Sequence, residues 1–437
     1  MPIAVGKFGS AIMSLSAQYA SNSAEKARLL FTIQSFPLVN AILLSLFTLA
    51  FGKQLSLLIT GSEQNGQFLL WAFWAQFLNT GTYYFLIFFR NEEDAKRFFF
   101  YNLFIVVVNI VVSFLLVAVF RIGVIGLLYS QVVSSGLVFL IMTAKFVLYS
   151  GYSFDLSMFK NTFSIAYPLT PKVFFGVFNN QFDKYMVGLL ASVGGVGIYD
   201  IGQRFSRFVF TFMTGVQNVF SPQVYKKMFD LGEKGGEEVG RYLTPFAYVC
   251  IAFALMVGLF SEEIIVLLTP KPYHGAIDIV TILTMFYGSM FFGKQPQLIF
   301  VKKTHVTTLL TLISIILNVS LIIPFVMKWG AMGAAWGTLI AGIISGSISF
   351  VVSQYYYEIN WQYKKLGMMF LILFSSSLLM ILLRHFAIVY ELRLLIKLLF
   401  LLSFIYVGIK SGVITSNNVM LIKSLFLNFK KTNEITI

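Results

Sequence analysis

Charged residues are scarce in this chain of 437 residues, because Asp, Glu, Lys and Arg together make up only 11% of it. Soluble globular proteins carry about 25% charged residues, so the composition excludes a soluble enzyme or binding protein. Cysteine is almost absent too, and the single residue of this type, Cys250, lies in an apolar run. One thiol excludes a disulfide framework and a zinc site made of several thiolates.

Histidine and nucleotide-binding glycines are also missing where an enzyme would need them. His274, His305 and His385 fall in separate loops without metal-ligand spacing, and the pattern Gly-x4-Gly-Lys-Ser/Thr does not occur. The longest loop between apolar runs, 225–241, is too short for the extramembrane domain that membrane glycan polymerases and ligases usually carry. We therefore predict no catalytic residues, no metal site, no cofactor and no ATP hydrolysis by this chain.

Long apolar runs dominate what is present, since 58% of the residues are hydrophobic and the mean hydropathy is +0.81. A helix needs about 20 apolar residues to span a bilayer. Thirteen runs approach this length: Met1–Ala20, Leu29–Phe51, Gln67–Phe89, Phe98–Phe120, Gly123–Leu148, Thr162–Leu190, Val196–Val224, Tyr242–Leu268, Ala276–Val301, Val306–Met327, Ala331–Tyr355, Leu366–Leu383 and Leu394–Ile409. They do not alternate between apolar and polar as the strands of a membrane barrel do. The sequence predicts an all-α, polytopic membrane protein.

The net charge of +14 could indicate a nucleic-acid partner, but most basic residues cluster in short loops between apolar runs. One set of loops and the tail hold Lys26, Arg28, Arg90, Lys96, Arg97, Lys145, Lys160, Lys226, Lys227, Lys234, Arg241, Lys302, Lys303, Lys364, Lys365, Lys410, Lys423, Lys430 and Lys431. The alternating loops hold Lys53, Arg121, Lys271, Lys328, Arg384 and Arg393. By the positive-inside rule the first set and the C-terminus are cytoplasmic, and we expect no nucleic-acid partner.

Several landmarks recur at nearly one spacing along the chain. Gly81, Gly123 and Gly126 return as Gly288, Gly330 and Gly333, each 207 residues later. Lys96-Arg97 returns as Lys302-Lys303 after 206 residues, and Asn109 as Asn318 after 209. Repeated helix bundles are typical of transporters, whose sites lie between the repeats. Chance matches in an apolar sequence of low complexity are the alternative.

The repeat divides the chain into an N-terminal bundle of five helices (1–150), a C-terminal bundle of six (151–357) and two tail helices with a basic tail (358–437). Counterparts of the run at 162–190 and of the start of the next run would precede Met1. We therefore expect that the N-terminal helix of the first bundle is missing. A truncated start and a short functional variant both explain this.

Charges interrupt the apolar sequence between residues 179 and 228. Asp183 and Lys184 come late in one apolar run, and Arg204 and Arg207 come early in the next, with a glycine-rich hinge at 191–197 between the runs. A charged side chain in lipid costs at least about 2.5–3.5 kcal/mol unless it faces water or the protein interior. The segment therefore predicts a polar cavity at membrane depth.

Cations outnumber acids among these embedded charges. Arg204 and Arg207 are three residues apart, so they share a helix face, with Asp200 one turn earlier. The predicted cavity cations are Arg204, Arg207, Lys172, Lys7, Lys184 and Lys294. Together they favour an anionic substrate such as a phosphate or an acidic sugar.

Alternatives remain for the acids and for the neutral polar residues. Asp183 could form an ion pair with Arg204 or Arg207 that joins two helices, and Asp183 or Asp200 could bind a coupling ion. The residues Gln76, Asn79, Tyr83, Tyr84, Asn179, Asn180, Gln181 and Gln203 could hydrogen-bond sugar hydroxyls. Such residues also join membrane helices to one another, which is the more common role.

Four short motifs resemble those of a known family. They are Tyr167-Pro168, Asp183-Lys184-Tyr185, Val196-Gly197-Ile198-Tyr199 and Ser221-Pro222. In this combination the chain resembles the polysaccharide flippases (Wzx type) of the multidrug/oligosaccharidyl-lipid/polysaccharide exporter superfamily. Family members commonly have Asp-Arg where this chain has Asp183-Lys184, which keeps the charge but changes the hydrogen-bond geometry.

The resemblance implies two pseudo-repeated helix bundles in a V around a central cavity, followed by two C-terminal helices. It implies a multi-pass protein of the bacterial cytoplasmic membrane that flips polyprenyl-pyrophosphate-linked oligosaccharide by alternating access, for O-antigen, capsule or exopolysaccharide synthesis. Expected partners are the lipid-linked oligosaccharide, membrane lipids, a glycan polymerase and glycosyltransferases. The alternatives are an ion-coupled multidrug exporter of the same superfamily, a membrane-embedded glycan polymerase or ligase, and a scaffold that does not transport.

Overall fold

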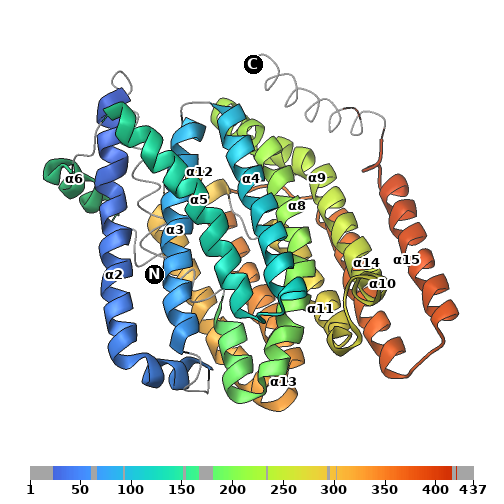
Figure 1. The fold of residues 1–437 in the computed structure, drawn as a ribbon. Helices are drawn as coiled ribbons and strands as arrows, with labels where there is room; N and C mark the ends of the chain where they lie inside the picture. Colours follow the sequence, from blue (N-terminus) through green and yellow to red (C-terminus); the bar gives the residue numbers. More distant parts are fainter. Residues whose placement is uncertain are drawn as a thin grey trace. The chain divides into compact units, whose positions relative to one another are not determined.

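The computed structural model describes residues 23–60, 66–91, 94–150, 154–166, 181–232, 235–292, 296–301, 303–415 and 420. Helices joined by short turns make up the described part of the chain, and no strand occurs in it (Figure 1). The chain divides into two compact units, residues 1–178 and 179–437. The all-α prediction is confirmed, whereas the run at 1–20 lies outside the described residues.

The described part of unit 1 contains four long helices and one short one. They are α2 (Ser23–Thr60), α3 (Gly66–Asn91), α4 (Ala95–Phe114, extended by a π-helical turn, Leu115–Val119), α5 (Ile125–Ser150) and α6 (Leu156–Ala166). Helix α3 packs against α2 and α5, α4 packs against α5, and α6 packs against α2. These helices match the four apolar runs predicted between residues 29 and 148.

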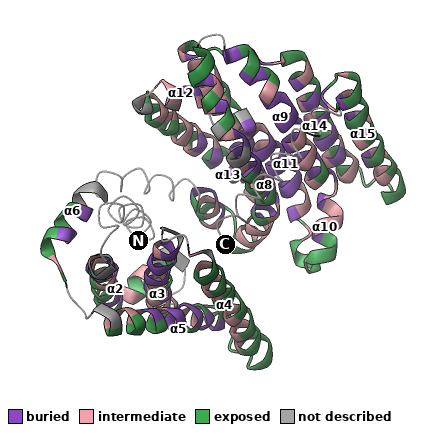
Figure 2. Ribbon diagram, turned by 90° about the horizontal axis from the view of Figure 1, so that it is seen from above, coloured by how far each residue is buried: buried purple, intermediate pink, exposed green. Residues whose placement is uncertain are grey.

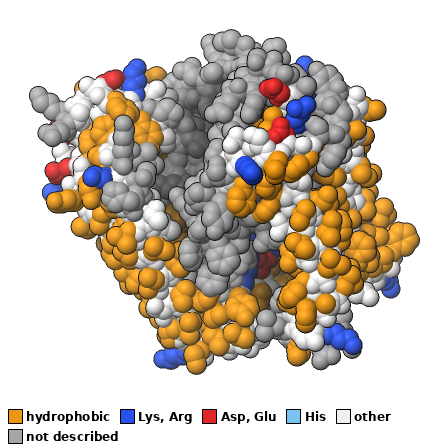
Figure 3. All heavy atoms as spheres, turned by 90° about the vertical axis from the view of Figure 1, so that its left-hand side faces the viewer, with side chains coloured by type: hydrophobic (Ala, Val, Ile, Leu, Met, Phe, Trp, Pro, Cys, Tyr) orange, Lys and Arg blue, Asp and Glu red, His pale blue; other side chains and the backbone are white. Residues whose placement is uncertain are grey.

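The core of unit 1 is rich in aromatic rings. Tyr84, Phe85 and Phe89 of α3 are buried with Leu30 of α2. Helix α4 exposes apolar side chains, and none of its most apolar stretch is buried. Such a surface is suited to lipid rather than to water. Apolar side chains cover most of the described surface in Figure 3.

Unit 2 begins with helical residues 181–190, which α8 (Val193–Leu231) follows after a tight turn. The other elements are α9 (Gly235–Leu259), α10 (Ser261–Leu268), α11 (Ala276–Ser289), α12 (Pro296–Phe300), α13 (Thr304–Tyr356), α14 (Tyr363–His385) and α15 (Tyr390–Lys410). Helices α9 and α11 pack against each other, and both pack against α8 and α14. Buried residues concentrate on α9 and α11, as Figure 2 shows, so these two helices form the core of the unit.

Three sequence predictions for unit 2 need correction. The run 242–268 is not one span, because α9 ends before Phe260 and α10 starts at Ser261 with two acids in its first turn. The run 276–301 also breaks, since α11 ends at Ser289 and Pro296 starts the short helix α12. The glycine-rich hinge is mostly helix, because Ser192 caps α8 by accepting from the Gly195 amide at 3.0 Å. Acidic residues in the first turn and proline at the first position both favour the start of a helix. A side chain that accepts from a free backbone amide stabilises such a start.

The two spans predicted at 306–327 and 331–355 are the halves of α13. They join at Gly330, whose φ of +57° and ψ of −134° lie in a region that is open almost only to glycine. Gly333 follows with its Cα against the carbonyl oxygen of Phe325, where a side chain would not fit. In unit 1 the turn between α4 and α5 uses Gly123 at φ +78°. Equivalent glycines therefore make the equivalent turn in both units.

Seven of the described helices are long and apolar enough to cross a membrane, and α13 counts once among them although it holds two apolar halves. Together with the apolar outer surface, this makes the chain a multi-pass membrane protein.

Buried ion pairs tie the two tail helices to the rest of unit 2. The Arg384 guanidinium of α14 lies 2.6 Å from the Asp278 carboxylate of α11. Lys397 of α15 is fully buried, with its Nζ 2.6 Å from Glu263 of α10 and 3.4 Å from Glu262. These contacts lie at the end of the unit that the charge pattern predicts to be outside the cell.

Candidate functional site

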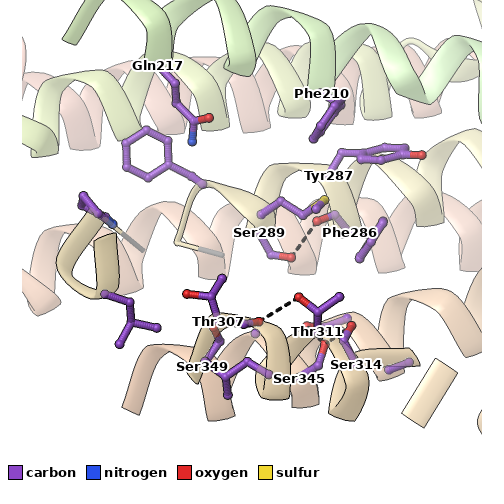
Figure 4. Close-up of a pocket in the computed structure, with 18 of the residues that line it drawn as sticks. Phe210, Gln217, Phe286, Tyr287, Ser289, Thr307, Thr311, Ser314, Ser345 and Ser349 are labelled. Atoms are coloured by element: carbon purple, nitrogen blue, oxygen red, sulfur yellow. Dashed lines mark hydrogen bonds between the residues drawn. The ribbon is translucent and has the colours of Figure 1, made fainter. Parts of the chain in front are cut away.

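A cavity of about 940 Å³ lies within unit 2. Its walls come from helical residues 181–190, α8, α11 and both halves of α13 (Figure 4). The lining combines aromatic rings, amides and hydroxyls, and Arg207 and Asp183 are the charged residues of its described part. Its lining is therefore mixed, with two opposite charges and several hydroxyls and amides among apolar side chains.

One face of α8 forms a wall along most of that helix. Gln203, Arg207, Phe210, Gln217 and Val224 line the cavity at spacings of three, four or seven residues, which place them on one side of a helix. From Gln203 to Tyr225 this wall is about 33 Å long at 1.5 Å per residue. It runs from the middle of the unit toward the end that the charge pattern predicts to be cytoplasmic.

Arg207 is the cation of this wall. Its guanidinium lies beside the Tyr287 hydroxyl of α11. None of the ion pairs found among the described residues involves Arg207. A guanidinium with free N–H groups in a cavity can bind a phosphate or carboxylate oxygen in a two-pronged geometry.

Asp183 is the acid of the cavity and is only 4% exposed. Its Oδ2 accepts a hydrogen bond from the Tyr199 hydroxyl of α8 at 2.7 Å, and the Thr338 hydroxyl of α13 lies 3.2 Å away. Its Oδ1 has no hydrogen-bond partner among the described residues. Asp183 thus joins three segments through hydrogen bonds, and the alternative of an ion pair with Arg204 or Arg207 is not among its described contacts.

Asp200 binds two of the predicted cavity cations. Lys184 forms an ion pair with Oδ1 of Asp200, and Nε of Arg204 lies 2.6 Å from Oδ2. The pair between Lys184 and Asp200 links helical residues 181–190 to α8. The Arg204 side chain is 74% exposed, and none of these three residues lines the cavity.

The structure therefore brings Arg207 and Asp183 together in one cavity and places Lys184, Arg204 and Asp200 beside it. Lys7, Lys172 and Lys294 lie outside the described residues. Of the neutral residues proposed to contact sugar, Gln203 lines the cavity. Tyr84 is instead fully buried in the core of unit 1.

Sequence reasoning missed the polar wall opposite α8. Both halves of α13 contribute to it, and we call it the α13 hydroxyl wall. Its members are Thr307, Thr311, Ser314, Asn318, Thr338, Ser345 and Ser349. Figure 4 shows Thr307, Thr311, Ser314, Ser345 and Ser349 gathered on one side of the cavity, with Phe210 and Gln217 on the other. Spacings of four, three and four residues from Thr307 to Asn318 were the available signal, within a run interpreted as uniformly apolar.

Comparison with solved structures shows the same fold in known membrane transporters. The lipid II flippase MurJ in an inward closed conformation has a TM-score of 0.66 at 19% identity, over 94% of this chain and 90% of that chain. An inward-facing multidrug resistance MATE family transporter of the MOP superfamily gives 0.64 at 15% identity, over 81% and 86%. A point mutant of the Vibrio cholerae MATE transporter VcmN gives 0.54 at 14% identity, over 81% and 84%.

Comparison with curated proteins found no match to the chain. A family model does match, over residues 12–278, which is more than half of the chain. That model describes a polysaccharide biosynthesis protein. The matched region includes all of unit 1 that the structure describes, together with the α8 wall, Arg207 and Asp183 of the cavity. With the fold of the MOP superfamily, the chain belongs to the polysaccharide biosynthesis protein family.

Proposed function

We propose that this chain is a flippase that moves polyprenyl-pyrophosphate-linked oligosaccharide across the bacterial cytoplasmic membrane by alternating access. The product would enter surface polysaccharide such as O-antigen, capsule or exopolysaccharide. The C-terminus would be cytoplasmic, as the basic loops indicate. Glycosyltransferases would supply the substrate, and a glycan polymerase would consume it.

The observation that carries the proposal is Arg207 on the wall of a large cavity that also contains hydroxyls and amides, in a membrane protein of a polysaccharide family. A pyrophosphate carries its charge into a region of low dielectric only if cations and hydrogen-bond donors replace its water. We assign Arg207 to the pyrophosphate. Arg204 and Lys184 would bind the pyrophosphate only if their ion pairs with Asp200 broke. Lys7, Lys172 and Lys294 keep the role predicted from the sequence.

Asp183 and Asp200 receive different roles in this proposal. Asp200 links two helical segments through its ion pair with Lys184, and its other oxygen binds Arg204 of its own helix. Asp183 has one buried oxygen without a partner among the described residues, so we assign to it a coupling ion that supplies the energy for transport. A transporter with no nucleotide-binding motif needs such a gradient, or removal of its product.

An ion-coupled exporter of cationic drugs is the second candidate. Asp183 favours it, because a buried carboxylate in an aromatic cavity attracts an organic cation. Arg207 in the same cavity opposes it, because a like charge would repel such a substrate. We propose a transporter rather than a glycan polymerase or ligase because the fold matches those of transporters.

Deletion of the gene tests the proposed function. We expect loss of surface polysaccharide and accumulation of lipid-linked oligosaccharide in the cytoplasmic leaflet, where added external glycosidases cannot reach it. Plasmid-borne wild-type chain should restore both. Normal surface polysaccharide after deletion, together with increased retention of a cationic dye, would instead support the drug exporter.

A further inference from the structure

The α13 hydroxyl wall is chemically distinct from the rest of the cavity. All seven of its members are neutral, and each carries a hydroxyl or an amide. From Asn318 to Thr307 it is about 17 Å long at 1.5 Å per residue, which is longer than a single sugar ring. A neutral wall of this length does not suit a phosphate, which needs cations, or a cationic drug, which needs acids.

Two atoms of this wall have unused hydrogen-bonding capacity. Thr307 Oγ1 and Asn318 Oδ1 are buried and have no hydrogen-bond partner among the described residues. Buried polar groups are nearly always paired, and leaving one unpaired costs about 1–3 kcal/mol. If both side chains rotate toward the cavity, a ligand with many hydroxyls satisfies both atoms, because a hydroxyl both donates and accepts.

The equivalent asparagine of unit 1 shows that this situation is particular to unit 2. Asn109 of α4 donates to Ser134 at 3.3 Å and to Ser130 at 3.4 Å, both on α5. The turn glycines of the two units are 207 residues apart in the sequence. At the same spacing, Ser130 corresponds to Gly337 and Ser134 to Ala341. Neither has a side-chain acceptor or donor. Unit 2 therefore has the asparagine without the serines that bind it in unit 1, and Asn318 lines the cavity.

Aromatic rings stand opposite the hydroxyl wall. Phe210 of α8 and Tyr287 of α11 line the cavity across from it, whereas the Phe286 ring packs against Gly342 of α13 beside the wall (Figure 4). Flat aromatic faces pack against apolar surface, and sugar rings offer their C–H faces for such packing while their hydroxyls point sideways. A hydroxyl wall facing aromatic rings therefore matches both parts of a saccharide.

We propose that the α13 hydroxyl wall is the subsite for the glycan of the transported lipid, separate from the pyrophosphate position at Arg207. This inference rests on the proposed function and refines it. Arg207 holds the part that all such lipids share, and the wall distinguishes a lipid that carries sugars from one that does not. Asn318 and Thr307 each provide a side-chain oxygen that has no hydrogen-bond partner among the described residues. Ser314 and Ser345 share a long hydrogen bond of 3.3 Å, so their hydroxyls can turn toward a ligand.

The test compares two probes on purified protein in lipid nanodiscs. One probe is polyprenyl pyrophosphate without sugar, and the other is the lipid-linked oligosaccharide fraction from the source bacterium. We expect wild-type chain to bind the second probe more tightly. Thr307→Val combined with Asn318→Leu should reduce that binding about tenfold, the value of one to two hydrogen bonds, and leave binding of the bare pyrophosphate unchanged.

The matched control is Ser353→Ala. Ser353 is also buried on α13 with a hydroxyl that has no partner among the described residues, but it lies outside the cavity lining. It should leave both affinities unchanged. Because the replaced atoms of the double variant have no partners in the described part of the protein, folding should not suffer, and a thermal unfolding curve checks this.

The outcomes separate the two proposals. Equal loss of affinity for both probes in the folded double variant, or an unchanged preference for the glycosylated probe, would overturn the glycan subsite and leave the flippase proposal standing. Failure of the wild-type chain to bind either probe would overturn the proposed function itself.

Discussion

Arg207→Ala is expected to lower surface polysaccharide at least about tenfold while the protein remains folded in the membrane. A hydrogen bond to a charged group is worth about 1.5–3 kcal/mol, which corresponds to about 10- to 150-fold in binding. Arg207 is on the cavity wall, and none of the ion pairs among the described residues uses it, so its loss should act on substrate rather than on stability. Quantified surface polysaccharide in a deletion strain carrying the variant checks this.

Two further variants make the result specific. Arg207→Lys should retain part of the activity, because it keeps the charge and loses the two-pronged geometry. Arg241→Ala should behave as wild type, because Arg241 is an exposed cation of unit 2 outside the cavity, paired with Glu237 at 2.5 Å. Wild-type polysaccharide in the Arg207→Ala strain would remove Arg207 from any substrate role.

The second large effect is expected at the buried charges of the tail. Lys397→Met should destabilise the protein by about 3 kcal/mol, because removing one member of a buried ion pair leaves the other charge uncompensated. Lys397 is 0% exposed and binds both Glu262 and Glu263. After its loss, Glu263 keeps only the Tyr390 hydroxyl at 3.0 Å among the described residues. Equilibrium unfolding in mixed micelles measures the change in free energy.

A double variant separates the ion pair from simple packing. Lys397→Met with Glu263→Gln should recover most of the lost stability, since replacing both partners of a buried pair is often close to neutral. Lys410→Met, at the exposed end of the same helix, is the control and should change little. If the single and double variants were equally unstable, the ion pair would not be what holds α15 in place.

Hydrophobic length predicted most helices because a bilayer imposes it. Runs such as 366–383 and 394–409 correspond directly to α14 and α15, and the span boundaries there need few tertiary contacts to define them. The predicted spans were wrong where an apolar run continues through a change in the direction of the chain. The run 242–268 looks uniform, yet the break at Phe260 depends on Glu262 and Glu263 binding Lys397 and Arg393 of α15, far away in the sequence.

The site was only partly predictable, because spacing gives a helix face but not what that face meets. Arg204 and Arg207 share a face, yet Arg204 turns back to Asp200 while Arg207 lines the cavity. The sequence left open an ion pair of Asp183 with Arg204 or Arg207, and the described contacts of Asp183 are with Tyr199 and Thr338. The Asp200–Arg204 pair is local to α8 and its spacing is visible in the sequence, whereas the contacts of Asp183 depend on what α8 and α13 bring to it, which a single sequence does not contain.

The α13 hydroxyl wall was missed for a related reason. Serine and threonine in membrane helices usually bond to their own backbone or join neighbouring helices, as Thr311 does with the Thr307 carbonyl at 2.8 Å. Nothing in the sequence separates those roles from lining a cavity. The unpartnered oxygens of Thr307 and Asn318 become visible only once the described helices around them are in place.

Transbilayer movement of the lipid-linked oligosaccharide in proteoliposomes tests the account most directly. Purified chain is reconstituted with the native lipid-linked fraction, and a membrane-impermeant glycosidase reports how much substrate is exposed outside. The account predicts that wild-type chain makes nearly all of the substrate accessible, whereas vesicles with Arg207→Ala protein leave the inner-leaflet share protected, as empty vesicles do. Equal protection with wild-type protein and with no protein, under imposed proton or sodium gradients as well, would contradict it.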